Sequence, residues 1–169
     1  MTSATFWPAP ARRALEALHA GALRGLDGLG LLALRLWLAQ EFGLAGWTKL
    51  AGGLHAPEWF ATLRFPGPLA AWPPDVNWVL AGGTELLAAL ALVLGWPVRL
   101  AALALLFVTA VAVYAAHADL GWAGWNQIDT PEGAGFKVPL MIMLMLTTLL
   151  ERGAGRWAWR PTPSCGARR

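Results

Sequence analysis

Cysteine and histidine are scarce in this chain of 169 residues. Cys165 is the only cysteine, which excludes an internal disulfide, a Cys-x-x-Cys redox pair and a thiolate metal cluster. The three histidines show no His-x-x-x-His spacing. Because metal sites in proteins draw mainly on clustered Cys, His, Asp and Glu side chains, we predict no resident metal.

Charged residues are also few, at 14% of the chain, whereas soluble domains have about 25%. Hydrophobic residues make up 57% and gather in long blocks that are apolar on every side of a helix, which is typical of membrane spans. The net charge of +3 comes from basic residues near the chain ends rather than from a patch interleaved with aromatic residues. We therefore expect a lipid bilayer, and no nucleic acid, as partner.

The stretch of residues 29–50 organises the chain. It is almost continuously apolar, yet it carries Arg35, Glu41 and Lys49. An apolar helix of about 20 residues crosses a hydrocarbon core of roughly 30 Å. Ionisable residues inside such a helix are costly and usually face a protein interior or a wet cavity, so these three charges need partners.

Four stretches are predicted to cross the membrane as helices, at residues 28–50, 78–94, 98–117 and 135–151. Five prolines interrupt the connection 51–77, within which the segment PEWFATLRF predicts a short helix. We therefore predict an all-α polytopic membrane protein with a four-transmembrane-helix bundle at 28–152. A partly amphipathic segment, 1–27, precedes this bundle, and a basic tail, 153–169, follows it.

Positive charges set the expected orientation. Arginines are concentrated in the N-terminal segment, in the turn at Arg99 and in the tail, while the two longer loops contain only Arg64 between their borders. Positive charge favours the cytoplasmic side. Both termini are therefore predicted to be cytoplasmic, in a multi-pass protein of a bacterial inner membrane.

Five ionisable residues are expected near one level of the membrane. With a rise of about 1.5 Å per residue, Glu41 and Glu85 lie roughly 12 Å and 10 Å below the outer ends of their spans. The outer boundary itself is close to Lys49, His117 and Lys137. We predict an intramembrane charge cluster or ligand site from these residues, with the structural charges Arg35 and Arg99 toward the inner side.

Three interpretations of the outer cluster stay open. The carboxylates can be structural, paired across helices or with the lysines. They can instead line a pocket for a quinone or a small polar substrate, with His117 and the carboxylates relaying protons. A third interpretation is a metal or ion path through the bundle, for which two Glu and one His supply the ligands.

Loose motifs over residues 30–156 occur in an order and spacing that resemble the DoxX family. They comprise Arg35, Phe42, Gly46, Lys49 and Leu50 in the first span, the loop WFATLRFPGP, Glu85, Gly95 before Arg99, His117, and the exit Gly153-Ala154-Gly155-Arg156. The sequence departs from the family pattern after this exit, where Trp157-Ala158-Trp159 stands in place of a Ser-Leu-Asp-like segment. The GWNQ loop and the following FKVPLM are similar to a subgroup that accompanies copper-responsive peptide maturation systems.

The resemblance implies a four-helix protein of the bacterial inner membrane. Some DoxX proteins are described as membrane subunits linked to quinone or thiosulfate oxidation, or as partners in redox-stress complexes. We therefore expect a subunit of a redox-linked or stress-response complex, not a complete enzyme by itself, with a quinone as the candidate cofactor or ligand. Alternatives are a scaffold for a peptide maturation system and a small ion or metabolite transporter. A protein partner is expected, and a second copy of the chain is a further candidate.

Overall fold

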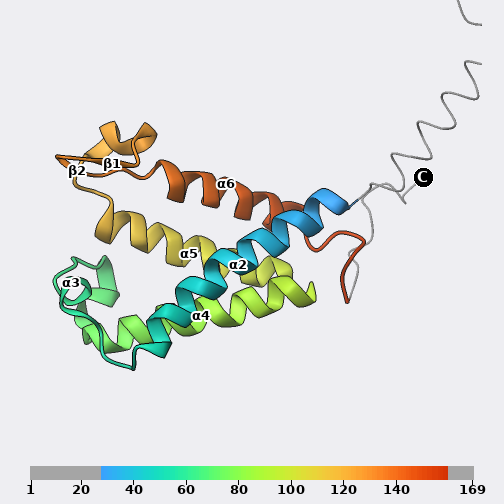
Figure 1. The fold of residues 1–169 in the computed structure, drawn as a ribbon, viewed down its shortest axis with the longest axis horizontal. Helices are drawn as coiled ribbons and strands as arrows, with labels where there is room; N and C mark the ends of the chain where they lie inside the picture. Colours follow the sequence, from blue (N-terminus) through green and yellow to red (C-terminus); the bar gives the residue numbers. More distant parts are fainter. Residues whose placement is uncertain (1–27, 160–169) are drawn as a thin grey trace, which may run out of the picture.

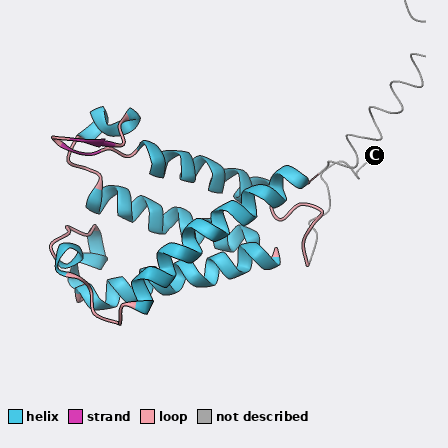
Figure 2. Cartoon of the chain, viewed as in Figure 1, coloured by secondary structure: helices cyan, strands magenta, loops and turns pink. Residues whose placement is uncertain are grey.

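The computed structural model describes residues 28–159. Four long helices form its frame: α2 (Leu29–Ala51), α4 (Pro74–Leu94), α5 (Val98–Ala116) and α6 (Lys137–Arg152) (Figures 1 and 2). These bounds lie close to those expected from the apolar stretches. The amphipathic segment predicted before residue 28 and the last ten residues of the basic tail lie outside the described residues.

Shorter elements connect the long helices. They are α3 (Glu58–Ala61), the 3-10 helices η1 (Gly67–Ala71) and η2 (Gly121–Asn126), and the antiparallel strands β1 (Asp129–Thr130) and β2 (Gly133–Ala134). In Figure 1, α3 and the β1–β2 hairpin lie at one end of the molecule, here called the loop end. Both ends of the described chain lie at the opposite, terminal end (Figure 1). The fold is thus mostly helical as expected, and the small hairpin is an addition that sequence reasoning missed.

A tight turn makes α4 and α5 antiparallel neighbours. Gly95 ends α4 in the left-handed region, at φ 78°, and its backbone N–H donates to the carbonyl of Ala91 at 2.9 Å. Glycine adopts this conformation without the steric cost that a Cβ brings. Because Pro97 follows within two residues, the helix cannot continue and α5 begins at once.

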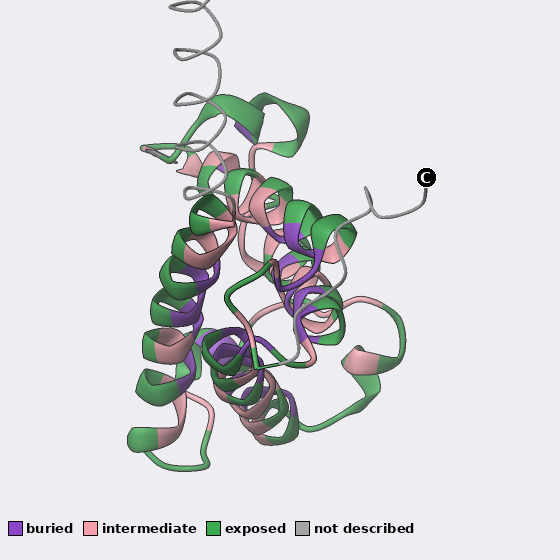
Figure 3. Ribbon diagram, turned by 90° about the vertical axis from the view of Figure 1, so that its right-hand side faces the viewer, coloured by how far each residue is buried: buried purple, intermediate pink, exposed green. Residues whose placement is uncertain are grey.

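The core lies between the four long helices, where α2 packs chiefly on α4, and α5 packs on α4 and α6. Alanines on the facing sides of α4 and α5 allow the larger side chains of α2 and α6 to fill the interior. The buried hydrophobic residues include Leu38, Phe42, Ala88, Leu92, Ala102, Leu105, Leu146 and Leu149. Figure 3 shows the buried positions on the sides that the helices turn toward one another.

The outer surface of the four helices is mostly apolar, and Gln40 and Glu41 of α2 are exposed exceptions. Large side chains that are more than half exposed include Leu44 on α2, Leu87 on α4, Phe107 on α5 and Leu144 on α6. Soluble monomers rarely expose so much contiguous apolar surface. Two helices, α4 and α5, are long and apolar enough to cross a membrane, whereas α2 carries three charges and α6 has 16 residues.

Candidate functional site

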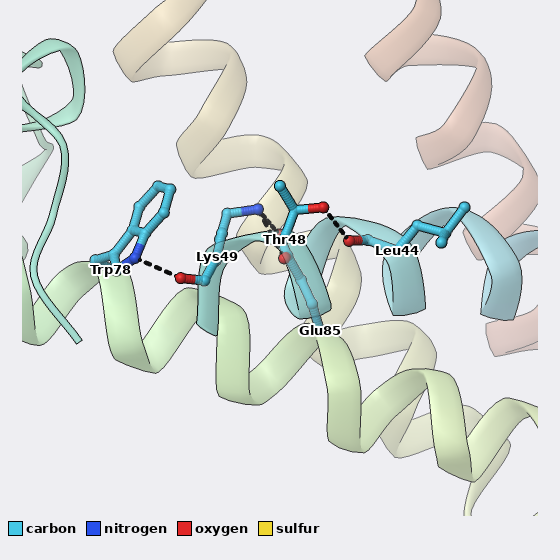
Figure 4. Close-up of polar contacts among 5 residues, drawn as sticks. All are labelled: Leu44, Thr48, Lys49, Trp78 and Glu85. Atoms are coloured by element: carbon cyan, nitrogen blue, oxygen red, sulfur yellow. Dashed lines mark hydrogen bonds and ion pairs between the residues drawn. The ribbon is translucent and has the colours of Figure 1, made fainter. Parts of the chain in front are cut away.

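A buried ion pair joins α2 to α4. Lys49, in the last turn of α2, places its Nζ 2.7 Å and 2.9 Å from the two carboxylate oxygens of Glu85, which lies in the middle of α4 (Figure 4). The side chains are 19% and 6% exposed. Removing two charges from water is costly, and only close, hydrogen-bonded contact offsets that cost. The two bonds from one ammonium meet this requirement.

Two glycines allow the helices to come close enough for this pair. A Cβ added to Gly46 on α2 would lie 2.7 Å from the carbonyl oxygen of Gly82 on α4. A Cβ added to Gly82 would lie 3.1 Å from the Cβ of Lys49. The missing side chains therefore make room for backbone contact and for the stem of Lys49.

Trp78 completes the surroundings of the pair. Its indole Nε1–H donates to the backbone carbonyl of Lys49 at 2.9 Å (Figure 4), and its ring lies 5.9 Å from the ammonium. The ring also packs edge-on against Phe60 of α3 and against Trp59, with centroids 4.9 Å and 5.9 Å away. The short helix α3 is thereby packed against the first turns of α4.

A cavity of about 400 Å³ lies beside Glu85, between the long helices and the loop that precedes α6. Most of its wall is apolar, and its polar side chains are Glu85, Thr109 and His117. Its remaining lining residues are Phe42, Val108, Ala112, Ile128, Gly135, Val138, Pro139 and Ile142. Concave apolar sites of about 300–1,000 Å³ with a few convergent polar groups are typical of ligand pockets.

His117 is held at the end of α5 by the loop before α6. Its Nδ1 lies 2.8 Å from the carbonyl oxygen of Gly135. Because a carbonyl can only accept, Nδ1 carries the proton in this contact, which directs the other ring nitrogen, Nε2, away from Gly135.

The structure divides the five residues expected in the outer cluster. Lys49 forms an ion pair with Glu85, and Glu85 and His117 both line the cavity. Glu41 lies on the exposed side of α2 and has no ion pair or side-chain hydrogen bond among the described residues. Lys137 begins α6 half-buried and does not line the cavity. Within residues 28–159 there is no group of three or more His, Cys, Asp or Glu that could hold a metal ion.

Comparison with known proteins assigns the chain to a family. The DoxX family model matches residues 30–118, which is more than half of the sequence. The chain belongs to the DoxX family. It is 39% identical over 132 residues to an uncharacterized protein of Haemophilus influenzae, covering 77% of this chain and 80% of that protein. No solved structure matches. Together with the two apolar helices α4 and α5, the family makes this a membrane protein.

Arg35 of this DoxX protein fastens the terminal end of the fold. It is 1% exposed, and its guanidinium donates to four backbone carbonyls: Leu92 at 2.9 Å, Val93 at 3.1 Å, Ala154 at 2.8 Å and Trp157 at 2.6 Å. These carbonyls belong to the end of α4 and to the segment after α6. A planar fork of five N–H donors suits this arrangement, which an ammonium could not reproduce.

Arg99, the second charge predicted at the inner side, makes fewer hydrogen bonds than Arg35 in this DoxX protein. It is exposed and donates once, from Nη2 to the carbonyl of Glu151 at 3.0 Å. Both arginines therefore lie at the terminal end, but only Arg35 is buried in the core.

Sequence reasoning missed two groups near the cavity. Trp78 donates to the backbone carbonyl of Lys49, a contact that no sequence pattern indicates. A single threonine in an apolar helix usually donates its hydroxyl to a backbone carbonyl of the same helix, so the sequence does not mark Thr109 as a site residue. Its Oγ1 does donate to the carbonyl of Leu105, at 2.8 Å. The one indication in the sequence that Thr109 belongs to the site is its spacing, eight residues before His117 in the same predicted span.

Proposed function

We propose that this DoxX protein crosses the bacterial inner membrane four times, through α2, α4, α5 and α6, with both termini in the cytoplasm. The mostly apolar exterior of all four helices supports four spans. Both ends of the described chain lie at the terminal end, as an even number of crossings requires (Figure 1). The arginine distribution supports the cytoplasmic side for that end. The loop end then faces the periplasm.

In this orientation the cavity lies toward the periplasmic side, and we propose that it binds a small apolar ligand, with a quinone as the candidate. The cavity of about 400 Å³ beside Glu85 and His117 carries this proposal. Its volume suits one ring system, and its few polar groups would orient that ring. A carboxylate and an imidazole can also exchange protons with a bound ligand.

The same geometry suits a subunit of a redox-linked or stress-response complex better than a complete enzyme. The side chains that line the cavity can bind and orient a ligand and can accept its protons. Electrons would have to pass to a partner protein. The proposed role is therefore to hold a membrane-soluble ligand for a partner in the same complex.

Native mass spectrometry of protein purified from its own membranes tests this function. Ala112 lines the cavity, so Ala112→Phe should fill it. Ala110, on the exposed side of the same helix, provides the matched control Ala110→Phe. We expect a bound small molecule on the wild type and on Ala110→Phe, and its loss from Ala112→Phe. A wild-type protein that carries no such molecule, or an Ala112→Phe variant that keeps it, would refute the ligand site.

The second candidate is a non-catalytic scaffold, such as the partner of a copper-responsive peptide maturation system. The Lys49–Glu85 pair favours it, because that pair already satisfies both charges without a ligand. A scaffold predicts that Glu85→Gln lowers thermal stability but leaves the activity of the complex unchanged at equal protein level. A loss of activity at unchanged protein level would instead support the ligand site.

A further inference from the structure

We propose that the cavity selects a ligand that donates hydrogen bonds, namely an apolar molecule with a phenolic or similar hydroxyl group. This inference rests on the proposed function and names the ligand class of the same site. Its basis is that each of the three polar side chains lining the cavity presents acceptors.

Glu85 presents only acceptors. Lys49 donates to both of its oxygens, at 2.7 Å and 2.9 Å, and such an ammonium pairs with the ionised carboxylate. An ionised carboxylate has no proton to give, but its two oxygens retain further lone pairs. Lys49 itself is not among the cavity's lining residues, so its ammonium does not supply a donor there.

Thr109 and His117 already donate hydrogen bonds to backbone carbonyls of the protein. The hydroxyl of Thr109 donates to Leu105 within α5, which leaves it lone pairs. The Nδ1–H of His117 donates to Gly135, so the ring nitrogen left for a ligand is Nε2, which is an acceptor whenever the ring is neutral. A ligand that brought only carbonyl oxygens would therefore find no donor among the cavity's side chains, and its acceptors would remain unpaired.

For a redox pair of ligands, this chemistry distinguishes the two forms. A hydroquinone carries two O–H donors, whereas the corresponding quinone carries two carbonyl acceptors. The cavity should therefore prefer the reduced form. The carboxylate and the imidazole are also the groups that would receive protons from it.

A matched pair of probes tests this preference, namely a 4-alkylphenol and its methyl ether, which differ in the single donor. Equilibrium dialysis against protein in lipid nanodiscs, with empty nanodiscs to subtract partitioning into lipid, gives both affinities. We expect the phenol to bind about tenfold more tightly or better, as one hydrogen bond to a buried or charged acceptor implies. His117→Phe, which removes one acceptor and keeps a ring, should reduce that ratio.

The outcomes separate this inference from the function on which it rests. If the ether binds as tightly as the phenol, the donor preference is wrong and the ligand site stands. If neither probe binds above the empty nanodiscs, both proposals fail.

A second inference rests on a different observation, the outward direction of Glu41. Glu41 and its neighbour Gln40 lie on the exposed side of α2, together with Trp37 and Leu44. With about 1.5 Å per residue, Glu41 is roughly 15–18 Å from either end of α2, which is near the middle of the proposed span. A carboxylate that faces lipid at this depth is costly, so this side of α2 requires a partner.

We infer that the partner is α2 of a second copy. A two-fold axis along the membrane normal places identical residues of both copies at the same depth, which an unrelated helix would have to match by chance. Gln40 has two N–H donors and Glu41 accepts, so Gln40 of each copy can donate to Glu41 of the other. Reciprocal Gln40–Glu41 hydrogen bonds would then close the interface between the two spans.

Disulfide trapping in native membranes tests the second copy. In a Cys165→Ser background, Leu44→Cys should form a disulfide-linked dimer, whereas Leu103→Cys on the exposed side of α5 should not. Adding Gln40→Leu and Glu41→Leu to the Leu44→Cys protein should lower the dimer yield several-fold. Equal trapping at both cysteines, or only monomers, would contradict the interface. A disulfide-linked band of a mass other than twice this chain would show a different partner on that side.

Discussion

Lys49 and Arg35 show two ways in which the fold accommodates a buried cation. Lys49 is neutralised by one carboxylate across a helix contact. Arg35 is instead surrounded by four carbonyl oxygens from two segments of the backbone. Burial of the lysine thus depends on an opposite charge, and burial of the arginine depends on the positions of the backbone carbonyls around it. The two sites should respond to substitution in different ways.

Removing one partner of the ion pair should cost more than removing both. Lys49→Met leaves the Glu85 carboxylate buried without its cation, for which we expect a loss of about 3–5 kcal/mol in the free energy of unfolding. Lys49→Met combined with Glu85→Leu removes both charges and should recover most of that loss. Thermal denaturation in one detergent compares the stability of the wild type, the Lys49→Met variant and the double variant. A double variant less stable than Lys49→Met would argue against a charge penalty.

At Arg35 the shape of the side chain should matter more than its charge. Arg35→Lys keeps the cation but cannot reach all four carbonyls, and bonds to charged groups contribute about 1.5–3 kcal/mol each. Hydrogen exchange of residues 154–158 should therefore accelerate by about tenfold or more. The control is Arg99→Lys, at an exposed arginine with a single carbonyl contact, which should leave this segment unchanged. Equal effects of both substitutions would contradict the assigned role.

At the scale of the elements, the contact between α2 and α4 positions the site. Its closest point is Gly46 against Gly82, one turn from the ion pair. Because the contact is between backbones, a single methyl group must push the helices apart. The glycines therefore link helix spacing to the geometry of Lys49 and Glu85.

Two alanine substitutions separate packing from helix propensity. Gly46→Ala places a Cβ 2.7 Å from the Gly82 oxygen and should destabilise the protein by about 1–3 kcal/mol. Gly83→Ala has nothing within 4 Å of the new Cβ and should stabilise α4 by up to about 1 kcal/mol. Melting temperatures in the same detergent compare them. The packing account fails if Gly46→Ala is as stable as Gly83→Ala.

The helices were predictable from the sequence, whereas the partners of their charges were predictable only in part. Apolar blocks and the Gly95–Pro97 turn set where α4 ends and α5 begins. Matching depth correctly drew attention to Glu85 but left open whether its partner is Glu41 or a lysine, since depth along a helix says nothing about which side a residue faces. Lys49, eight positions after Glu41, lies on the side of α2 that meets α4. The close contact of Gly46 with Gly82 shows which side α2 turns toward α4.

At the scale of the whole molecule, the proposed orientation places α3 and the β1–β2 hairpin in the periplasm. Exposed tryptophans at the loop end, such as Trp122 and Trp125, then lie where aromatic residues favour the membrane interface. The cavity would be reached from the outer leaflet. Arg35 and the chain ends would be on the cytoplasmic side.

Cysteine accessibility in spheroplasts tests this orientation. Thr62→Cys, at the exposed end of α3, should react in a Cys165→Ser background with a maleimide that cannot cross membranes. The native Cys165, in the tail, should react only after permeabilisation. The reverse pattern would invert the protein, and labelling of both in intact spheroplasts would require an odd number of crossings.

The central claim is that the cavity beside Glu85 and His117 takes up a small ligand from the membrane. Methyl NMR spectra of the protein in nanodiscs, recorded during titration with a 4-alkylphenol, test it most directly. The account predicts saturable shifts for the methyl groups of Val108, Val138 and Ile142, which line the cavity, and none for the exposed Val93 and Leu100. Shifts spread evenly over all exposed methyl groups, or no shifts at the cavity, would contradict it.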